Sequence, residues 1–166
     1  MSRLVLALDL STRTGWALGR DQEPPRHGVW ELSPHDNSLG ARFSALAASL
    51  EDALAVMAPD LVVMEAPLPP QAQTAMYTAR LQFGLAAVSE MISHERGVAI
   101  EEARADEVRS LVMGRARPGK EAIVAWCRTQ GWSPAEDNDA DALALLRYRH
   151  LLFRSRVTAG AGSVTV

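Results

Sequence analysis

The strongest constraint on this chain is an unbroken apolar run near its start that ends on a carboxylate. Leu4 to Leu8 contains no polar side chain, and Asp9 follows directly. Such a run is typical of a strand buried on both faces of an α/β sheet. Ionising Asp9 there costs several kcal/mol unless a cation or hydrogen-bond donors compensate. The alternative is that Asp9 only caps the following turn through its side chain.

The first half of the chain alternates between strands and one helix. After the turn Ser11–Gly15, apolar strands are expected at Trp16–Leu18 and His27–Leu32, which gives an antiparallel meander with the first strand. Apolar residues three and four apart predict an amphipathic helix over Leu39–Met57. The next strand, Leu61–Met64, is again followed by an acid, Glu65. A strand–helix–strand connection favours a parallel pair, which would place Asp9 and Glu65 at the same sheet edge.

The second half is mainly helical. We expect helices at 71–95, 105–113, 120–130 and 139–153, and a fifth strand at 97–102. The helix at 71–95 is apolar on more than one side, so we expect it to pack on the sheet and on a second copy of the chain. The whole is interpreted as one domain over residues 1–156, with a disordered tail at 157–166.

Composition excludes several classes of protein. One cysteine, Cys127, cannot form an internal disulfide and favours a reducing compartment. The short apolar run at the start is unlike a secretory signal, and no window approaches the ~20 apolar residues of a membrane span. We therefore expect a cytoplasmic protein without membrane contact. The net charge of −3 argues against a histone-like nucleic-acid binder, although a local basic face beside an acidic site would leave the same sum.

Acidic residues from distant parts of the chain form the candidate site. Besides Asp9 and Glu65, a cluster of Asp137, Asp139 and Asp141 enters the last helix. Hard oxygen ligands of this kind hold one or two Mg²⁺ ions for phosphodiester hydrolysis. Favourable interaction with the helix dipole is the simpler explanation for Asp137 and Asp139. It explains Asp141 less well, because the apolar run Ala142–Leu145 follows it.

The order of these motifs resembles the RuvC family of Holliday-junction resolvases, within the ribonuclease H-like superfamily, and most closely its phage-type members. The resemblance runs from Leu4 to about Tyr148 and rests on Asp9–Ala17, Met64–Pro67 and Asp137–Leu145. It implies an α/β, ribonuclease H-like fold with a five-stranded mixed sheet (a three-strand antiparallel meander plus two parallel strands) and helices on both faces. It also implies a homodimeric, Mg²⁺-dependent endonuclease for branched DNA, with Mn²⁺ as a substitute.

Carried over position by position, the resemblance assigns roles to individual residues. The catalytic residues would be Asp9, Glu65, Asp141 and Lys120, the last of which is the only lysine. The metal would be held by Asp9, Glu65 and Asp141 with Asp137 and Asn138. Junction DNA would contact Arg104, Arg109, Arg115, Arg117 and Lys120. The simpler explanation for Lys120 is a helix-start residue with no function.

Two positions depart from the family pattern. Asn138 stands where the family has its fourth acid; it could still ligate through its carbonyl oxygen, while Asp137 shares a helix face with Asp141 and Asp139 points away. Leu68, between prolines, stands where an aromatic residue often stacks at the junction centre, and Tyr77 is the next aromatic residue. These departures leave open how the metal site is completed and how the junction is opened, whether by an apolar wedge or otherwise.

Two other classes of protein remain as alternatives. The first is a catalytically weak or inactive DNA-binding protein that keeps the RuvC fold, which Asn138 and the negative net charge favour. The second is the actin-like ATPase or sugar-kinase superfamily, which also begins with a strand ending on Asp and a Ser/Thr-Gly turn. The chain has neither the length nor the second glycine-rich phosphate loop of that superfamily.

Overall fold

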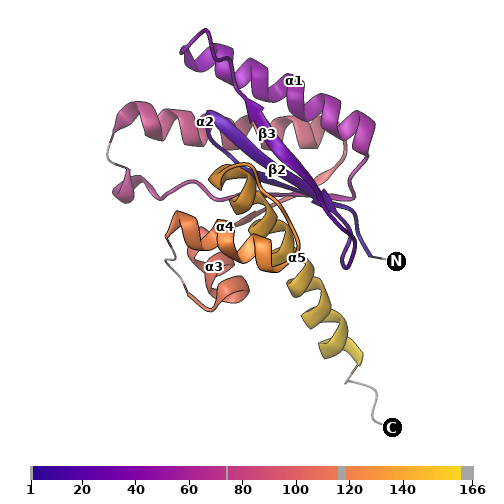
Figure 1. Ribbon diagram of the computed structural model, residues 1–166. Helices are drawn as coiled ribbons and strands as arrows, with labels where there is room; N and C mark the ends of the chain where they lie inside the picture. Colours follow the sequence, from indigo (N-terminus) through magenta and orange to yellow (C-terminus); the bar gives the residue numbers. More distant parts are fainter. Residues whose placement is uncertain (1, 74, 116–118, 162–166) are drawn as a thin grey trace.

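One five-stranded mixed sheet organises the computed structural model, in the order β3-β2-β1-β4-β5 (Figure 1). The structure describes residues 2–73, 75–115 and 119–161. The strands are β1 (Val5–Asp9), β2 (Arg13–Gly19), β3 (Arg26–Glu31), β4 (Leu61–Glu65) and β5 (Ala99–Ala103). The β1–β2 and β2–β3 pairs are antiparallel, and the β1–β4 and β4–β5 pairs are parallel. The predicted meander with two added parallel strands is therefore confirmed.

Strand register places the two strand-end acids side by side. In the parallel pair, Leu8 lies opposite Met64, and Asp9 and Glu65 are the next residues on their strands. Both carboxylates therefore emerge at the carboxyl edge of the sheet, next to each other. The helical crossover between β1 and β4 is what brings them there, since it returns the chain in the same direction.

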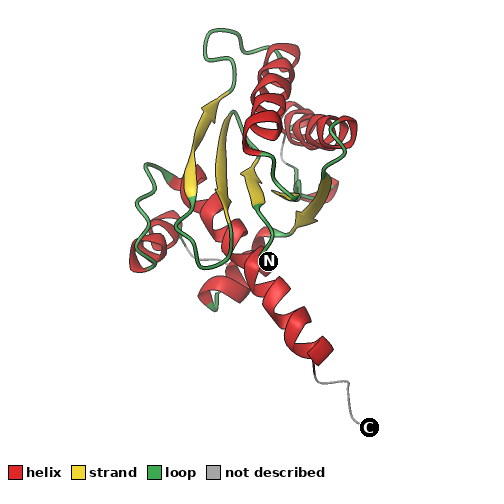
Figure 2. Cartoon of the chain, turned by 90° about the vertical axis from the view of Figure 1, so that its right-hand side faces the viewer, coloured by secondary structure: helices red, strands yellow, loops and turns green. Residues whose placement is uncertain are grey.

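Helices cover both faces of the sheet (Figures 1 and 2). Leu6 and Leu8 point into a core with one helical layer, whereas Val5 and Ala7 point into a core with the other, as the two-residue period of a strand requires. The first layer is α1 (Leu39–Met57) and α2 (Met76–Glu95). The second is α3 (Ala105–Met113), α4 (Lys120–Thr129) and α5 (Asp137–Ala161).

The predicted helix at 71–95 begins later than expected. Pro70–Ala72 forms only a single 3₁₀ turn, η1, and α2 starts at Met76. Gln73 is extended because its side-chain amide donates to the carbonyl of Leu68 and to Gln82, contacts that hold this segment outside the helix. The strand expected at 97–102 also shifts to 99–103, because Gly97 adopts a φ of 67° and turns the chain after α2.

The last helix is longer than predicted at both ends. It was expected over 139–153, and it extends through Ala161, so the tail predicted to be disordered from 157 is helical as far as that residue. Arg154 pairs with Asp21 in the turn after β2, an interaction between distant parts of the chain that stabilises the added turns. Residues 162–166 of the predicted tail lie outside the described residues.

Among the helices of the described ranges, none combines the length and the apolar character needed to cross a membrane.

Candidate active site

Three acids from three elements meet at the carboxyl edge of the sheet. Asp9 ends β1, Glu65 ends β4, and Asp141 lies in the second turn of α5, which packs on β1 and β4. Burial raises the pKa of Asp9 well above its usual range, and the charges of Glu65 and Asp141 raise it further. The three predicted carboxylates therefore act on one another as one cluster.

The cluster is short of positive charge. Burial and the charge of Asp141 raise the pKa of Glu65 to about 7, and burial also raises the pKa of Asp141, which Arg109 only partly offsets. Among the described residues, none donates a hydrogen bond to the side chain of Asp9 or Glu65 or pairs with it. Both side chains are half-buried, and ionising two such carboxylates without partners is costly, so the cluster favours a cation.

Two basic side chains at the edge of the cluster are each held by an acid. Arg109 of α3 lies with Nη2 3.2 Å from Oδ1 of Asp141, and both side chains are largely buried. Lys120, the first residue of α4, donates to Asp137 in the first turn of α5. This bond lowers the pKa of Asp137. Arg109 and Lys120 thus pair with the two α5 acids, and the charge of Arg109 offsets only part of the rise in the pKa of Asp9 and Glu65.

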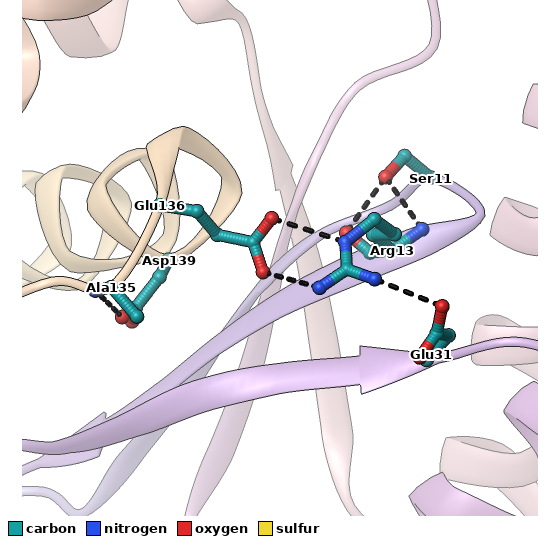
Figure 3. Close-up of polar contacts among 6 residues, drawn as sticks. All are labelled: Ser11, Arg13, Glu31, Ala135, Glu136 and Asp139. Atoms are coloured by element: carbon teal, nitrogen blue, oxygen red, sulfur yellow. Dashed lines mark hydrogen bonds and ion pairs between the residues drawn. The ribbon is translucent and has the colours of Figure 1, made fainter.

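An ion-pair network fixes where α5 begins (Figure 3). The guanidinium of Arg13 on β2 donates two hydrogen bonds to Glu136, at 3.1 and 2.8 Å, and a third to Glu31 on β3 at 2.9 Å. Bidentate geometry of this kind sets orientation as well as attraction. Because Glu136 immediately precedes α5, the network anchors the helix turn that carries Asp137 and Asp141.

Gly15 lets α5 approach the sheet closely. A Cβ atom at this position would lie 1.9 Å from the backbone oxygen of Asn138, a distance that no side chain tolerates. Gly15 is also the residue on β2 that pairs with Asp9. The start of α5 therefore sits against the strand position next to Asp9, and the glycine of the Thr14–Gly15 motif is explained by packing.

The three aspartates of the α5 cluster have different roles. Asp139 is buried and turned away from the site, as its spacing predicted: its Oδ1 lies 2.8 Å from Nδ1 of His27, and its Oδ2 accepts from the backbone N–H of Ala135 at 2.9 Å (Figure 3 shows the Ala135 bond). Asp139 therefore connects the loop before α5 to His27 on β3. Asp137 and Asp141 lie toward the strand-end acids, since both charges raise the pKa of Asp9.

The donor set fits a divalent cation, but the side chains have not converged on one. Within residues 2–73, 75–115 and 119–161, no three carboxylate, histidine or cysteine side chains lie close enough together to hold a metal as they stand. Asp141 is turned toward Arg109 and Asp137 toward Lys120. Carboxylates are the ligands that Mg²⁺ prefers, so binding would require Asp141 to rotate from Arg109 toward Asp9 and Glu65.

The residues predicted to contact DNA lie in different environments. Arg104 is exposed and pairs with Asp106 and Glu107, Arg109 is paired with Asp141 at the edge of the acid cluster, and Arg115 is exposed. Lys120 is 82% exposed at the mouth of the site. The prediction for Arg117 concerns a position outside the described residues. Asn138, the predicted amide ligand, lies in the first turn of α5 and makes no side-chain hydrogen bond within the described ranges.

One polar neighbour of the acids was missed at the sequence level. Gln82 of α2 lines a cavity of about 40 Å³ together with Asp9 and Glu65. Leu68, from the proline-rich loop, borders the same cavity. No sequence signal marks a lone glutamine in an amphipathic helix, because its relation to the acids depends on how α2 is rotated over the sheet.

A larger cavity lies on the other side of the proline-rich loop. It measures about 410 Å³ and lies between the loop residues Ala66–Pro69 and the start of α3, where Arg104, Asp106 and Arg109 line it. Arg109 therefore faces both this cavity and the acid cluster, while Leu68 borders both cavities. The loop after Glu65 separates the two spaces beside the candidate site.

Comparison with solved structures identifies the fold. A Thermus thermophilus RuvC structure matches with a TM-score of 0.72 and 20% identity, over 92% of this chain and 96% of that chain. RuvC of the same organism in complex with a Holliday junction substrate matches with a TM-score of 0.77 and 19% identity, over the same shares. The yeast mitochondrial Holliday junction resolvase Ydc2 matches with a TM-score of 0.57 and 14% identity, over 96% of this chain and 86% of that one.

Comparison at the level of sequence adds nothing further, since no protein-family model and no curated protein matches. The structural likeness covers nearly the whole chain. The motifs that resembled RuvC, beginning at Asp9, Met64 and Asp137, therefore lie in the fold that they implied, and the chain has the RuvC-type, ribonuclease H-like fold.

Proposed function

We propose that this protein is a metal-dependent, structure-selective endonuclease that cuts branched DNA and resolves four-way junctions. The observation that carries the proposal is the partnerless acid pair of Asp9 and Glu65 at the carboxyl edge of a RuvC-type sheet, with Asp141 beside it. A half-buried negative cluster of this kind has little structural use, because it destabilises the fold unless a cation joins it.

In the proposed reaction, Asp9, Glu65 and Asp141 hold the metal, and Asp137 or the carbonyl of Asn138 completes the site. Mg²⁺ or Mn²⁺ bound there would stabilise the charge that develops on the scissile phosphate and promote ionisation of the attacking water. Lys120 would leave Asp137 and contact the phosphate, adding a positive charge where negative charge grows. Arg109, released from Asp141, would contact the same strand.

DNA is proposed to approach across the ends of α3 and α4. Arg104 and Arg115, which flank α3, are exposed, and the exposed Lys120 at the start of α4 pairs with Asp137 beside the acids. Contacts of this kind to phosphates position a duplex without reading its sequence. Arg117 belongs to the same proposed surface.

A homodimer is proposed to form through α2. Met76, Phe83 and Met91 on this helix are 77%, 43% and 50% exposed, and their spacing of seven and eight residues places them on one side. Two copies of the site would then cut two strands of a junction. Sedimentation equilibrium at micromolar concentration should give a dimer, and Phe83→Glu should give a monomer. A monomeric wild-type protein at that concentration would contradict this part of the proposal.

The test of the proposed function is cleavage of a synthetic labelled four-way junction beside a linear duplex of the same sequence. Mg²⁺ or Mn²⁺ should give paired, symmetric cuts in the junction and none in the duplex, and EDTA should abolish both cuts. Equal cutting of duplex and junction would refute structure selectivity.

A non-catalytic DNA-binding protein is the second candidate. Two observations favour it: Asn138 occupies the position of an expected acid, and the acids of the described site have not converged. Junction binding without cuts in either metal would support this candidate. Restoring the acid with Asn138→Asp would then be the first variant to make, and regained cleavage would identify Asn138 as the cause.

A further inference from the structure

Gln82 has one end of its amide fixed by a neighbour. Gln73 donates through Nε2 to the backbone oxygen of Leu68 at 2.9 Å and to Oε1 of Gln82 at 2.7 Å. A carbonyl oxygen can only accept, so the atom of Gln73 that faces Leu68 must be its nitrogen. The atom of Gln82 that faces this nitrogen must in turn be its oxygen, because two NH₂ groups cannot bond to each other.

The other end of the amide is thereby committed as a donor. With Oε1 of Gln82 bonded to Gln73, the remaining polar atom is Nε2 with its two hydrogens. This atom makes no hydrogen bond to any residue that the structure describes. Gln82 lines the cavity of about 40 Å³ whose other ionisable or amide side chains are Asp9 and Glu65. A cavity of this size has room for ordered water.

Donors and acceptors in this cavity are complementary. Among the residues that the structure describes, the carboxylate oxygens of Asp9 and Glu65 have no hydrogen-bond donor and the two N–H groups of Gln82 have no acceptor. Leu10, Ala66, Pro67 and Leu68 form the rest of the wall and offer no side-chain donor. Carboxylates that bind metals are usually held by hydrogen bonds from neighbouring groups, which fix the direction of their lone pairs.

We propose that Gln82 is a positioning residue of the site: its amide donates to the carboxylates of Asp9 and Glu65, directly or through one water, and holds their other oxygens toward the metal. Gln73 keeps the amide in the orientation that makes this possible. The inference rests on the proposed function, since it assigns Gln82 a role toward the metal that the acids are proposed to bind. It places a residue of α2, the proposed dimer helix, in direct support of the acids.

The experiment compares Gln82→Met with the wild-type full-length protein. Methionine keeps the length of the side chain and removes both amide groups. Mn²⁺ affinity, measured by electron paramagnetic resonance without DNA, should fall about tenfold, the lower end of the loss seen when such supporting hydrogen bonds are removed. The kcat for junction cleavage should fall similarly, and the KM for the junction should stay within twofold.

Two further variants separate positioning from general damage. Gln73→Met leaves the Gln82 amide in place but free to turn over, and it should give a smaller loss of Mn²⁺ affinity in the same direction. Gln71→Met removes an exposed glutamine of the same segment, and its Mn²⁺ affinity and kcat should equal those of the wild type. A folded Gln82→Met protein with both quantities within twofold of wild type would overturn the proposal.

A measurement on the wild-type protein covers the case in which Gln82→Met does not fold. The side-chain amide resonances of Gln82 can be assigned by correlating them with the backbone resonances of the same residue. They should shift when Mg²⁺ is added, and those of Gln71 should not. Unchanged Gln82 resonances at saturating Mg²⁺ would overturn the proposal. If the wild type binds Mn²⁺ more tightly than Gln82→Met does but cuts no DNA, the proposed function fails and the role of Gln82 stands. If the wild type cuts junctions and Gln82→Met equals it, only the role of Gln82 fails.

Discussion

The two ends of the sheet hold aspartates in opposite electrostatic states. At the carboxyl edge of β1, Asp9 has no partner among the described residues, and burial with neighbouring acids raises its pKa. At the other end, Asp21 in the turn after β2 bonds to Arg154 and pairs with Arg147 at 3.5 Å. Burial also opposes ionisation of Asp21, but the hydrogen bond and charge of Arg154 outweigh it and lower the pKa.

Helix α5 contributes charged side chains to both ends of the sheet. The same helix supplies two arginines to Asp21 and a further acid, Asp141, to Asp9. The chain therefore contains the means to neutralise a partly buried acid and uses it at one end. At the other end Arg109 offsets only part of the repulsion among the acids, and a charge that destabilises the fold in this way is the usual sign of a group kept for binding or chemistry.

The largest difference between the two ends should appear in catalysis. Asp9→Asn should lower the rate of junction cleavage by roughly three orders of magnitude, the upper end for losing one electrostatic stabiliser, and should leave junction binding unchanged. Asp21→Asn, the matched change at the other end, should cut at nearly the wild-type rate. Single-turnover cleavage and gel-shift binding measure the two effects, and full activity of a clean Asp9→Asn preparation would refute the role of Asp9.

The second prediction breaks the contact that aligns α5 with the acid edge. Gly15→Ala places a methyl group 1.9 Å from the backbone oxygen of Asn138. The start of the helix must then move, which should lower stability by about 1–3 kcal/mol and reduce cleavage much more than junction binding. Gly40→Ala is the control, since a Cβ atom there meets nothing within 4 Å. Urea unfolding measures the stability of both variants. A Gly15→Ala protein as stable as the wild type would show that α5 lies farther from β2.

The third prediction concerns pH, where the two ends act with opposite sign. The pKa of Glu65 is about 7 in the folded protein against an ordinary 4.5, so the folded state holds this proton more tightly. Without metal, stability should therefore fall as pH rises from 4.5 to 7, by at most about 1.4 kcal/mol per pH unit from this group. The contribution of Asp21 should instead be lost as pH falls into and below its usual range.

Urea unfolding at pH 5, 6 and 7 in EDTA measures this dependence. Glu65→Gln should flatten it, and Mg²⁺ should offset the loss of stability at pH 7 by binding the ionised acids. The prediction fails if the wild-type protein becomes more stable between pH 5 and 7 in EDTA and Glu65→Gln does so by the same amount. Ionisation of Glu65 would then not lower the stability of the fold.

The smallest predicted effects are the stabilities of the two aspartate variants without metal. Asp9→Asn should raise the free energy of unfolding by about 1 kcal/mol, because it removes a half-buried carboxylate that has no partner among the described residues. Asp21→Asn should lower it by about 1 kcal/mol, since it breaks a partly exposed ion pair. Thermal unfolding in EDTA at pH 7 compares them, and a shift of the same sign in both would remove the contrast between the two ends.

Much of the fold and of the acid edge followed from local sequence patterns. Asp9 and Glu65 each end an apolar run, and a helical crossover between the runs requires parallel strands, so their meeting at one edge was predictable. Asp141 could be placed because Ala142–Leu145 marks the buried side of its helix. Helical spacing likewise predicted that Asp139 would turn away from Asp141.

The errors arose where side chains from distant segments decide the outcome. The start of α2 depends on Gln73, whose amide bonds to Leu68 and Gln82 rather than leaving the segment free to be helical. The end of α5 depends on the Arg154–Asp21 pair. The position of Gln82 beside the acids depends on how α2 rotates over the sheet, which no local pattern specifies.

The most direct test of the account is anomalous diffraction from crystals grown with Mn²⁺. We expect at least one peak bounded by Asp9, Glu65 and Asp141, with Asp141 rotated away from Arg109. No peak at this edge at saturating Mn²⁺, with Asp141 still paired to Arg109, would contradict a metal-dependent nuclease and favour the DNA-binding protein without catalysis.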